Sequence, residues 1–182
     1  MRIETTPLPG LLVLRPTVHR DDRGHFLESF NERTFAAATG LDLRFVQDNE
    51  SVSRRNVLRG LHLQVGVSAQ AKLVRVARGA VLDVCVDLRA DSPTLGRHFS
   101  IRLDDSAPVM LFIPEWFAHG LAVLEDNTLF QYKCSRYWDP AAERTLLWND
   151  PALAIEWGVT APIVNAKDQA GLPLKDLLAT LA

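Results

Sequence analysis

The sequence contains few cysteines, no long apolar run and little excess of either charge. Its 182 residues include two cysteines, Cys85 and Cys134, both in runs typical of strands. We expect two buried, unpaired thiols, the alternatives being a disulfide or a catalytic thiol. The formal net charge of -2 argues against nucleic acid or a membrane surface as the main partner, but it allows a local basic pocket for a phosphate-bearing small molecule.

The sequence shows no run typical of a membrane span or a targeting segment. No apolar run approaches the roughly 20 residues of a membrane span, and the segment after Met1 does not lead into the apolar stretch typical of a signal peptide. We therefore expect a cytoplasmic protein. Because no linker, low-complexity segment or internal repeat divides the chain, one domain over residues 1–182 is the simplest organisation.

Alternation of apolar and polar residues with a period of two is the main structural signal. Over 82–88 the aliphatic residues share one face, and Asp83, Cys85 and Asp87 share the other. Residues 128–134 alternate in the same way, and turn-forming residues separate such runs at close spacing. Many short strands joined by regular turns predict a β-sandwich or barrel.

Helix is scarce in this sequence. Asn31 is a good helix cap, an alanine-rich segment follows it, and Gly40 can end the helix. A second short helix is expected over Leu174–Leu181, after Pro173. The chain is therefore predicted to be mainly β with short helices.

Two segments, 59–64 and 114–120, each carry one histidine close to a glycine in strand-like surroundings. Barrels that hold a metal on such strands usually draw on a His-x-His pair. Here the residue two positions after His62 is Gln64, and the residues two positions before and after His119 are not histidines either. We therefore expect no metal. The sequence also shows no phosphate-cradling glycine-rich loop and no dinucleotide fingerprint, and we expect no cofactor.

Basic residues lie on neighbouring candidate strands around His62. Taken alone, His62 would be an ordinary packed or surface histidine, but Arg59, Lys72 and Arg75 near it suit an anionic ligand. Such cations would favour the neutral imidazole, which is the form that a general base needs. Arg59 and His62 are three residues apart, so both can reach one pocket only if the strand bulges, which Gly60 makes feasible.

Tyr132 shares one face of its predicted strand with Phe130 and Cys134. A tyrosine that faces the inside of a small barrel needs a partner for its hydroxyl group. The simplest interpretation is a structural tyrosine bonded to the backbone, and a functional role is the alternative.

Motifs lie along almost the whole chain, in segments 22–28, 45–51, 57–64, 72–76, 113–115, 117–120, 132–133, 143–144, 148–151 and 167–168. Together they resemble the motifs of the dTDP-4-dehydrorhamnose 3,5-epimerases, cupin-type enzymes of nucleotide-sugar metabolism. Any one motif is weak, but this many in this order identify the chain as a member of that family. The resemblance implies a double-stranded β-helix (jelly-roll) barrel with short peripheral helices, no metal or redox cofactor, and a homodimer.

The resemblance implies catalytic roles for four residues. His62 would be the base that removes a proton next to the 4-keto group of the sugar, and Asp168 would pair with His62 and fix its tautomer. Tyr132 would return a proton on the opposite face of the ring. Lys72 would lie near the keto oxygen, where enolate charge develops. Without the resemblance, Asp168 would be a surface carboxylate and Lys72 a solvated lysine.

The resemblance also implies a set of substrate-binding residues. Trp138 would stack on the thymine ring, and Arg23 and Glu28 would contribute to nucleotide binding near the subunit interface. Without the resemblance, Trp138 would be a packing residue and Lys167 a solvated lysine. The other members are Arg59 and His119, which would complete the polar pocket, and Gln47, Asn49, Glu143 and Lys167, which would contact the ligand.

Three positions depart from the family pattern. Histidine is common where this chain has Glu50, an aromatic residue where it has Leu63, and glycine where it has Trp116. Trp116 either narrows the pocket or packs at the surface.

The expected reaction is epimerisation of dTDP-4-dehydro-6-deoxy-D-glucose at C3 and C5, giving dTDP-4-dehydro-L-rhamnose. One alternative is an epimerase of the same dTDP-4-keto-6-deoxy sugars that acts at C3 only. The other is a non-catalytic barrel that binds a sugar nucleotide.

Overall fold

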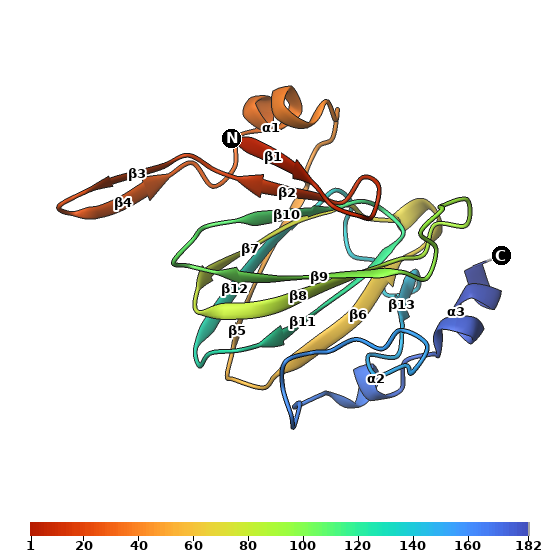
Figure 1. Cartoon of the computed structure of the whole chain (residues 1–182). Coiled ribbons are helices and arrows are strands. Elements are labelled where there is room, and N and C mark those ends of the chain that lie inside the picture. The colour runs from red at the N-terminus through yellow and green to blue at the C-terminus, as the bar shows by residue number, and fades with distance from the viewer. Residues whose placement is uncertain (182) are drawn as a thin grey trace.

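The computed structural model describes residues 1–181, and it consists mainly of short antiparallel strands (Figure 1). A six-stranded sheet has the order β1-β2-β10-β7-β12-β5, and a five-stranded sheet has the order β13-β6-β11-β8-β9. The strands are β1 (Arg2–Thr5), β2 (Leu12–Arg15), β3 (Val18–Asp21), β4 (Gly24–Leu27), β5 (Gln47–Ser53), β6 (Leu58–Gln64), β7 (Lys72–Arg78), β8 (Ala80–Asp87), β9 (His98–Asp104), β10 (Met110–Ile113), β11 (Phe117–Val123), β12 (Thr128–Cys134) and β13 (Glu143–Thr145).

The two larger sheets face each other, and apolar side chains from both fill the space between them. Val74 and Phe130 come from the six-stranded sheet, and Cys85 and Leu121 come from the five-stranded sheet; all four are buried in one cluster. Strands far apart in the sequence are neighbours within each sheet, as in β6-β11-β8. This arrangement confirms the predicted double-stranded β-helix barrel.

The alternation of β8 and β12 was predicted correctly. Asp83 and Cys85 point between the sheets, whereas Val84 and Val86 point outward into a second apolar cluster. The strand predicted over 128–134 is β12, with the same bounds. Both cysteines are buried and unpaired, as predicted.

Segments from the two ends of the chain cover the outer faces of the barrel (Figure 1). Helix α1 (Glu32–Thr39) packs Phe35 against Phe112 on the outside of the six-stranded sheet. The C-terminal segment buries Leu177 with Val84 on the outside of the five-stranded sheet. This segment contains α2 (Ala166–Gln169) and α3 (Leu174–Leu181), and a short 3-10 helix, η1 (Gly66–Ser68), lies between β6 and β7.

Local sequence explains the helix that the pattern predicted near the N-terminus. The Asn31 side chain accepts the backbone N–H of Thr34, and Gly40 ends α1 in the left-handed conformation with φ of 72°. Helix α3 also has its predicted bounds. Helix α2 was not predicted, because its four residues are too few to show a helical period.

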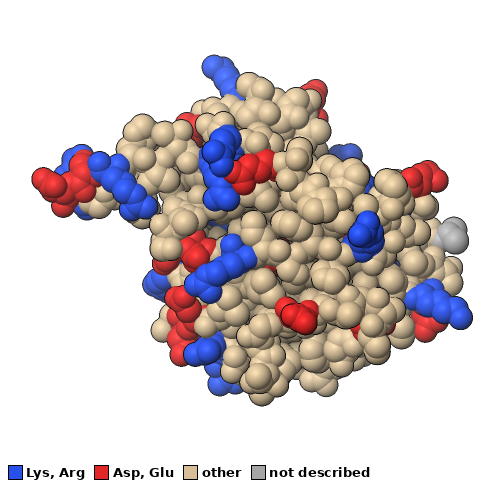
Figure 2. Space-filling view, viewed as in Figure 1, with Lys and Arg blue, Asp and Glu red and all other residues tan. Residues whose placement is uncertain are grey.

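The hairpin β3–β4 stands away from the barrel (Figure 1), and the Phe26 side chain on it is 70% exposed. Figure 2 shows acidic and basic side chains intermixed on this hairpin, and no broad surface of one sign on the face in view. In the described part of the chain, no helix is both long enough and apolar enough to cross a membrane.

Candidate active site

A β-bulge beside Gly60 directs two residues of β6 into one cavity. The register between β6 and β11 shifts there, because β6 carries one more residue than β11 over the paired segment. Gly60 has φ of 112°, and a Cβ on it would lie 2.6 Å from the Cα of Gly120, so only glycine fits. Arg59 and His62 therefore both line the cavity, which their spacing of three residues allows only with such a bulge.

This cavity has a volume of about 360 Å³ and lies between the two larger sheets. His62 and His119 project into it from the five-stranded sheet, and Lys72 and Tyr132 project into it from the six-stranded sheet. A second space of about 310 Å³ shares part of this lining, and we call the two spaces together the active-site groove. The second space is lined by His62, Lys72, Tyr132 and Glu143 and also by Gln47, Asn49 and Trp138.

His62 is hydrogen-bonded to the buried carboxylate of Asp168. The distance from His62 Nε2 to Asp168 Oδ1 is 2.6 Å, and Asp168 Oδ2 accepts the backbone N–H of Gly60 at 2.9 Å. Burial opposes the ionisation of Asp168, but these hydrogen bonds outweigh it and hold the pKa of Asp168 below its ordinary value. Because the ionised carboxylate accepts the hydrogen on Nε2, Nδ1 is the nitrogen of His62 that can take up a proton.

The short helix α2 delivers Asp168 to this contact. Asn165 caps α2, and its Oδ1 accepts the backbone N–H of Asp168 at 2.7 Å. The preceding residue, Lys167, does not join this contact but pairs with Glu143 of β13, with 2.7 Å between Lys167 Nζ and Glu143 Oε2. The contact between α2 and β13 thus places three of the predicted site residues at one side of the groove.

A second histidine–carboxylate pair lies beside the first. His119 is opposite His62 in the β6–β11 pair, and its Nε2 is 3.0 Å from each carboxylate oxygen of Asp83. Both His119 and Asp83 are buried. Asp83 was not among the predicted site residues. The sequence did offer one sign of Asp83: it is a carboxylate within a predicted strand rich in aliphatic residues. The structure turns its side of the strand toward the space between the sheets.

Burial changes the acidity of the two groups on the opposite wall. It raises the pKa of Tyr132, so the hydroxyl keeps its proton at neutral pH. It lowers the pKa of Lys72, because the charged amine is disfavoured away from water. Tyr132 lines the cavity, and within residues 1–181 its hydroxyl group has no hydrogen bond to the backbone.

Arg23, Glu28 and Arg75 do not line the active-site groove, and the first two were expected near a subunit interface rather than in the pocket. Arg23 is exposed on the hairpin and paired with Asp21, and Glu28 hydrogen-bonds the cap of α1; neither lines the groove. The predicted grouping of Arg75 with Lys72 is wrong. These two residues are three apart on the regular strand β7, so Arg75 faces outward and lines a different hollow.

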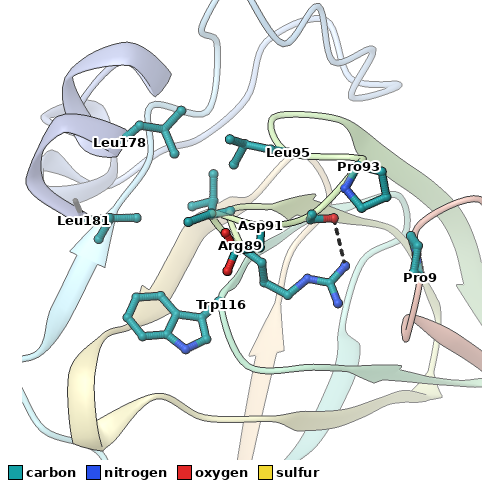
Figure 3. Close-up of a pocket in the computed structure, with 11 residues that line it drawn as sticks. Pro9, Arg89, Asp91, Pro93, Leu95, Trp116, Leu178 and Leu181 are labelled. Atoms are coloured by element: carbon teal, nitrogen blue, oxygen red, sulfur yellow. Dashed lines mark hydrogen bonds between the residues drawn. The ribbon is translucent and has the colours of Figure 1, made fainter.

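A larger cavity of about 600 Å³ lies away from the groove (Figure 3). Trp116 lines it together with Leu178 and Leu181 of α3, and this settles where the unusual tryptophan packs. Among the described residues no histidine lines this cavity, and the guanidinium of Arg89 there is held by the buried Asp87 at 2.6 Å. Its lining includes the carboxylate of Asp91 but none of the histidine and tyrosine side chains that face each other in the active-site groove.

The other two departures from the family pattern are Leu63 and Glu50. Leu63 is buried in the apolar cluster under the C-terminal segment, and the exposed Glu50 accepts a hydrogen bond from Gln131. In residues 1–181, no three histidine, cysteine, aspartate or glutamate side chains gather as a metal site requires.

Known proteins match this chain over nearly its whole length. A family model described as dTDP-4-dehydrorhamnose 3,5-epimerase matches residues 5–176. The chain is 46% identical over 181 residues to the dTDP-4-dehydrorhamnose 3,5-epimerase of Salmonella typhimurium, covering 99% of each chain.

Solved structures are similar over nearly the whole chain as well. The dTDP-6-deoxy-D-glucose-3,5-epimerase of Legionella pneumophila, in complex with dTDP-4-keto-L-rhamnose, has a TM-score of 0.94 and 39% identity, with 99% of this chain and 96% of that chain covered. A 3'-monoepimerase of Streptomyces bikiniensis, in complex with dTDP-quinovose, has a TM-score of 0.92 and 32% identity, with 100% and 92% covered.

Proposed function

The chain belongs to the dTDP-4-dehydrorhamnose 3,5-epimerase family, and from this premise we propose that it converts dTDP-4-dehydro-6-deoxy-D-glucose to dTDP-4-dehydro-L-rhamnose. The observation that carries the proposal is the placement of His62 and Tyr132 on opposite walls of one cavity. Inversion of a carbon centre needs a base on one face of the ring and an acid on the other.

The first step belongs to His62. Its Nδ1 takes the proton from a carbon next to the 4-keto group, and the electron pair of the broken C–H bond forms the double bond of an enolate. The negative charge moves to the keto oxygen. Asp168 stabilises the imidazolium that results and holds the ring in place, because its carboxylate is buried and bonded to Nε2.

The enolate then needs stabilisation and a proton. Lys72 lies on the wall opposite His62, and its protonated amine would stabilise the negative charge on the keto oxygen. Arg59 and His119 complete the polar lining. Tyr132 donates its hydroxyl proton to the far face of the carbon, and the carbonyl reforms. Solvent exchange returns the proton to Tyr132 and removes the one on His62.

The nucleotide would lie along the part of the groove that Gln47, Asn49 and Trp138 line. The Trp138 side chain is 58% exposed there and offers a free ring face for the thymine base. Lys167 would be available to the diphosphate once Glu143 releases it.

Epimerisation at C3 alone is the second candidate, because one of the similar structures is that of a 3'-monoepimerase. The two reactions differ in whether the ring presents C5 to the base. Proton NMR of the purified protein with dTDP-4-keto-6-deoxyglucose in D2O separates them. We expect deuterium at both C3 and C5. Deuterium at C3 alone would establish the monoepimerase, and no exchange above the protein-free control would refute catalysis.

We also propose a homodimer in which the β3–β4 hairpin packs against the second copy. A two-stranded hairpin is marginally stable alone in water, and this one exposes Phe26 and carries Arg23 away from its own groove. Sedimentation equilibrium should give twice the chain mass. The Phe26→Asp variant should shift the protein toward the monomer, and a monomeric wild type would refute the proposal.

A further inference from the structure

Three glutamine side chains hold the backbone of residues 136–139, which we call the Trp138 loop. We call Gln47, Gln64 and Gln70 the glutamine clamp; they come from β5, from β6 and from the turn before β7. The bonds run from Gln70 Nε2 to the Arg136 oxygen (2.8 Å), from Gln64 Nε2 to the Tyr137 oxygen (3.2 Å), from the Trp138 N–H to Gln47 Oε1 (2.9 Å) and from the Asp139 N–H to Gln64 Oε1 (2.6 Å).

Gln64 is the buried centre of the glutamine clamp, with 4% of its surface exposed. Besides its bonds to the Trp138 loop, its Nε2 donates to the backbone oxygen of Ser68 at 2.8 Å. Both ends of the amide are therefore used within the protein. Gln64 stands two residues after His62, at the position where a metal-binding barrel carries its second histidine, and here it ties the strand of the base to the Trp138 loop.

The Trp138 loop has little apolar packing of its own. Tyr137 and Trp138 are 72% and 58% exposed, and neither belongs to a buried apolar cluster of the described residues. Hydrogen bonds from the glutamine clamp, together with one from Ser68 Oγ to Asp139 Oδ2 at 2.9 Å, thus restrain a loop whose tryptophan faces the groove. A surface loop without such restraints samples many conformations, and a ligand that needs it ordered then binds more weakly.

We propose that Gln47, Gln64 and Gln70 are positioning residues for nucleotide affinity, because they preform Trp138 as a stacking platform for the pyrimidine base of the substrate. This inference rests on the proposed function, and specifically on Trp138 stacking on the base. The glutamine clamp acts on binding rather than on proton transfer, since His62 and Tyr132 are held by other contacts.

Calorimetric titration with dTDP tests the proposal, because dTDP lacks the reacting sugar. Trp138→Ala should raise the dissociation constant about 10-fold, which is within the range for loss of one base stack. Gln64→Met keeps the volume of the side chain and removes all its hydrogen bonds. It should raise the dissociation constant about 5-fold or more while kcat at saturating substrate stays within about 3-fold of wild type.

The double variant Gln64→Met/Trp138→Ala shows whether Gln64 influences dTDP binding through Trp138. If Gln64 acts through Trp138, the double variant binds dTDP no more weakly than Trp138→Ala alone. Independent effects that multiply would overturn the proposal, as would a Gln64→Met protein that loses kcat but keeps its affinity for dTDP.

Gln64→Met leaves buried backbone groups unpaired and risks misfolding, so Gln70→Ala provides a second variant at the exposed edge of the glutamine clamp. It should weaken dTDP binding about 2-fold or more, again only when Trp138 is present. Unchanged binding in both variants, with Trp138→Ala still weakened, would refute the glutamine clamp alone. A wild-type protein that does not bind dTDP would instead refute the proposed function.

Discussion

His62 and Asp168 are 106 residues apart in the sequence, yet 2.6 Å separates His62 Nε2 from Asp168 Oδ1. His62 belongs to the barrel, and Asp168 belongs to the C-terminal segment that covers its five-stranded sheet. This contact joins the barrel to the C-terminal segment, so the conformation of that segment affects how the ring of His62, the proposed base, is held.

Asn165 tests this dependence, because its side chain caps α2 and bonds the backbone N–H of Asp168. We expect Asn165→Ala to lower kcat about 10-fold or more, since small misplacement of a catalytic group is costly, with little change in KM. Asn165→Ser restores a good cap without adding charge, and it should recover most of the activity. Equal activity in the alanine and serine variants would show that the cap does not position Asp168.

The opposite-wall arrangement predicts different losses for the two proton-transfer groups. His62→Asn should abolish deuterium exchange at both carbons, with a fall of about 100-fold or more in rate, because the variant lacks the imidazole that is proposed to remove the proton. Tyr132→Phe should still exchange the substrate proton but invert the centre much more slowly, since His62 can return a deuteron to the same face. NMR separates exchange from inversion. Equal loss of exchange in both variants would contradict the assigned faces.

Gly60 should not tolerate a side chain. Gly60→Ala would press a Cβ against Gly120 and displace the bulge that aims Arg59 and His62, so we expect severe loss of activity and about 3 kcal/mol or more of lost stability. Gly66→Ala is the control: Gly66 has φ of 63°, and nothing lies within 4 Å of an added Cβ. It should cost about 1 kcal/mol and preserve kcat. Urea unfolding and steady-state kinetics measure both effects.

Asp168 should contribute stability that depends on pH. Its pKa in the fold lies below the ordinary value of 3.8, so its contribution is present above pH 3.8 and is lost as the pH falls through the lowered value. Asp168→Asn should therefore cost on the order of 1 kcal/mol in free energy of unfolding near neutral pH, and the difference from wild type should shrink below about pH 4. Urea unfolding from pH 3 to pH 7 measures it, and a difference independent of pH would contradict the expectation.

Trp116 should be dispensable for catalysis, because it lines the cavity beside α3 and not the active-site groove (Figure 3). Its φ of 66° suits glycine better than tryptophan, so Trp116→Gly relieves backbone strain while removing apolar contacts. We expect kcat/KM within about 2-fold of wild type and a change in stability below about 1 kcal/mol. A 10-fold loss of kcat/KM would indicate that Trp116 influences the groove.

Local patterns in the sequence were sufficient for many of the elements. The period of two over 128–134 matched β12 residue for residue, because one side of that strand faces the core and the other does not. Asn31 and Gly40 determined the ends of α1 through bonds within a few residues of each. The spacing of Arg59 and His62 indicated that they could share one pocket only if the strand bulged, and the structure has that bulge at Gly60.

The composition of the groove was recognised through motifs rather than through geometry. The motif residues His62, Lys72, Tyr132 and Asp168 do line one cavity. Asp83 was missed because a carboxylate in a strand has no local partner that marks it, and its histidine lies 36 residues away. Arg75 was misplaced because proximity in the sequence does not say which face of a sheet a residue occupies.

The sequence by itself determined several strands, the caps of α1 and the chemical groups, because each of these depends on residues close together in the chain. Only the tertiary structure decided which groups meet. The pairing of His62 with Asp168, the opposite walls that hold His62 and Tyr132, and the glutamine clamp on the Trp138 loop all join segments from different parts of the fold. Such contacts depend on how two sheets and their covering segments pack, and that packing is a property of the whole chain.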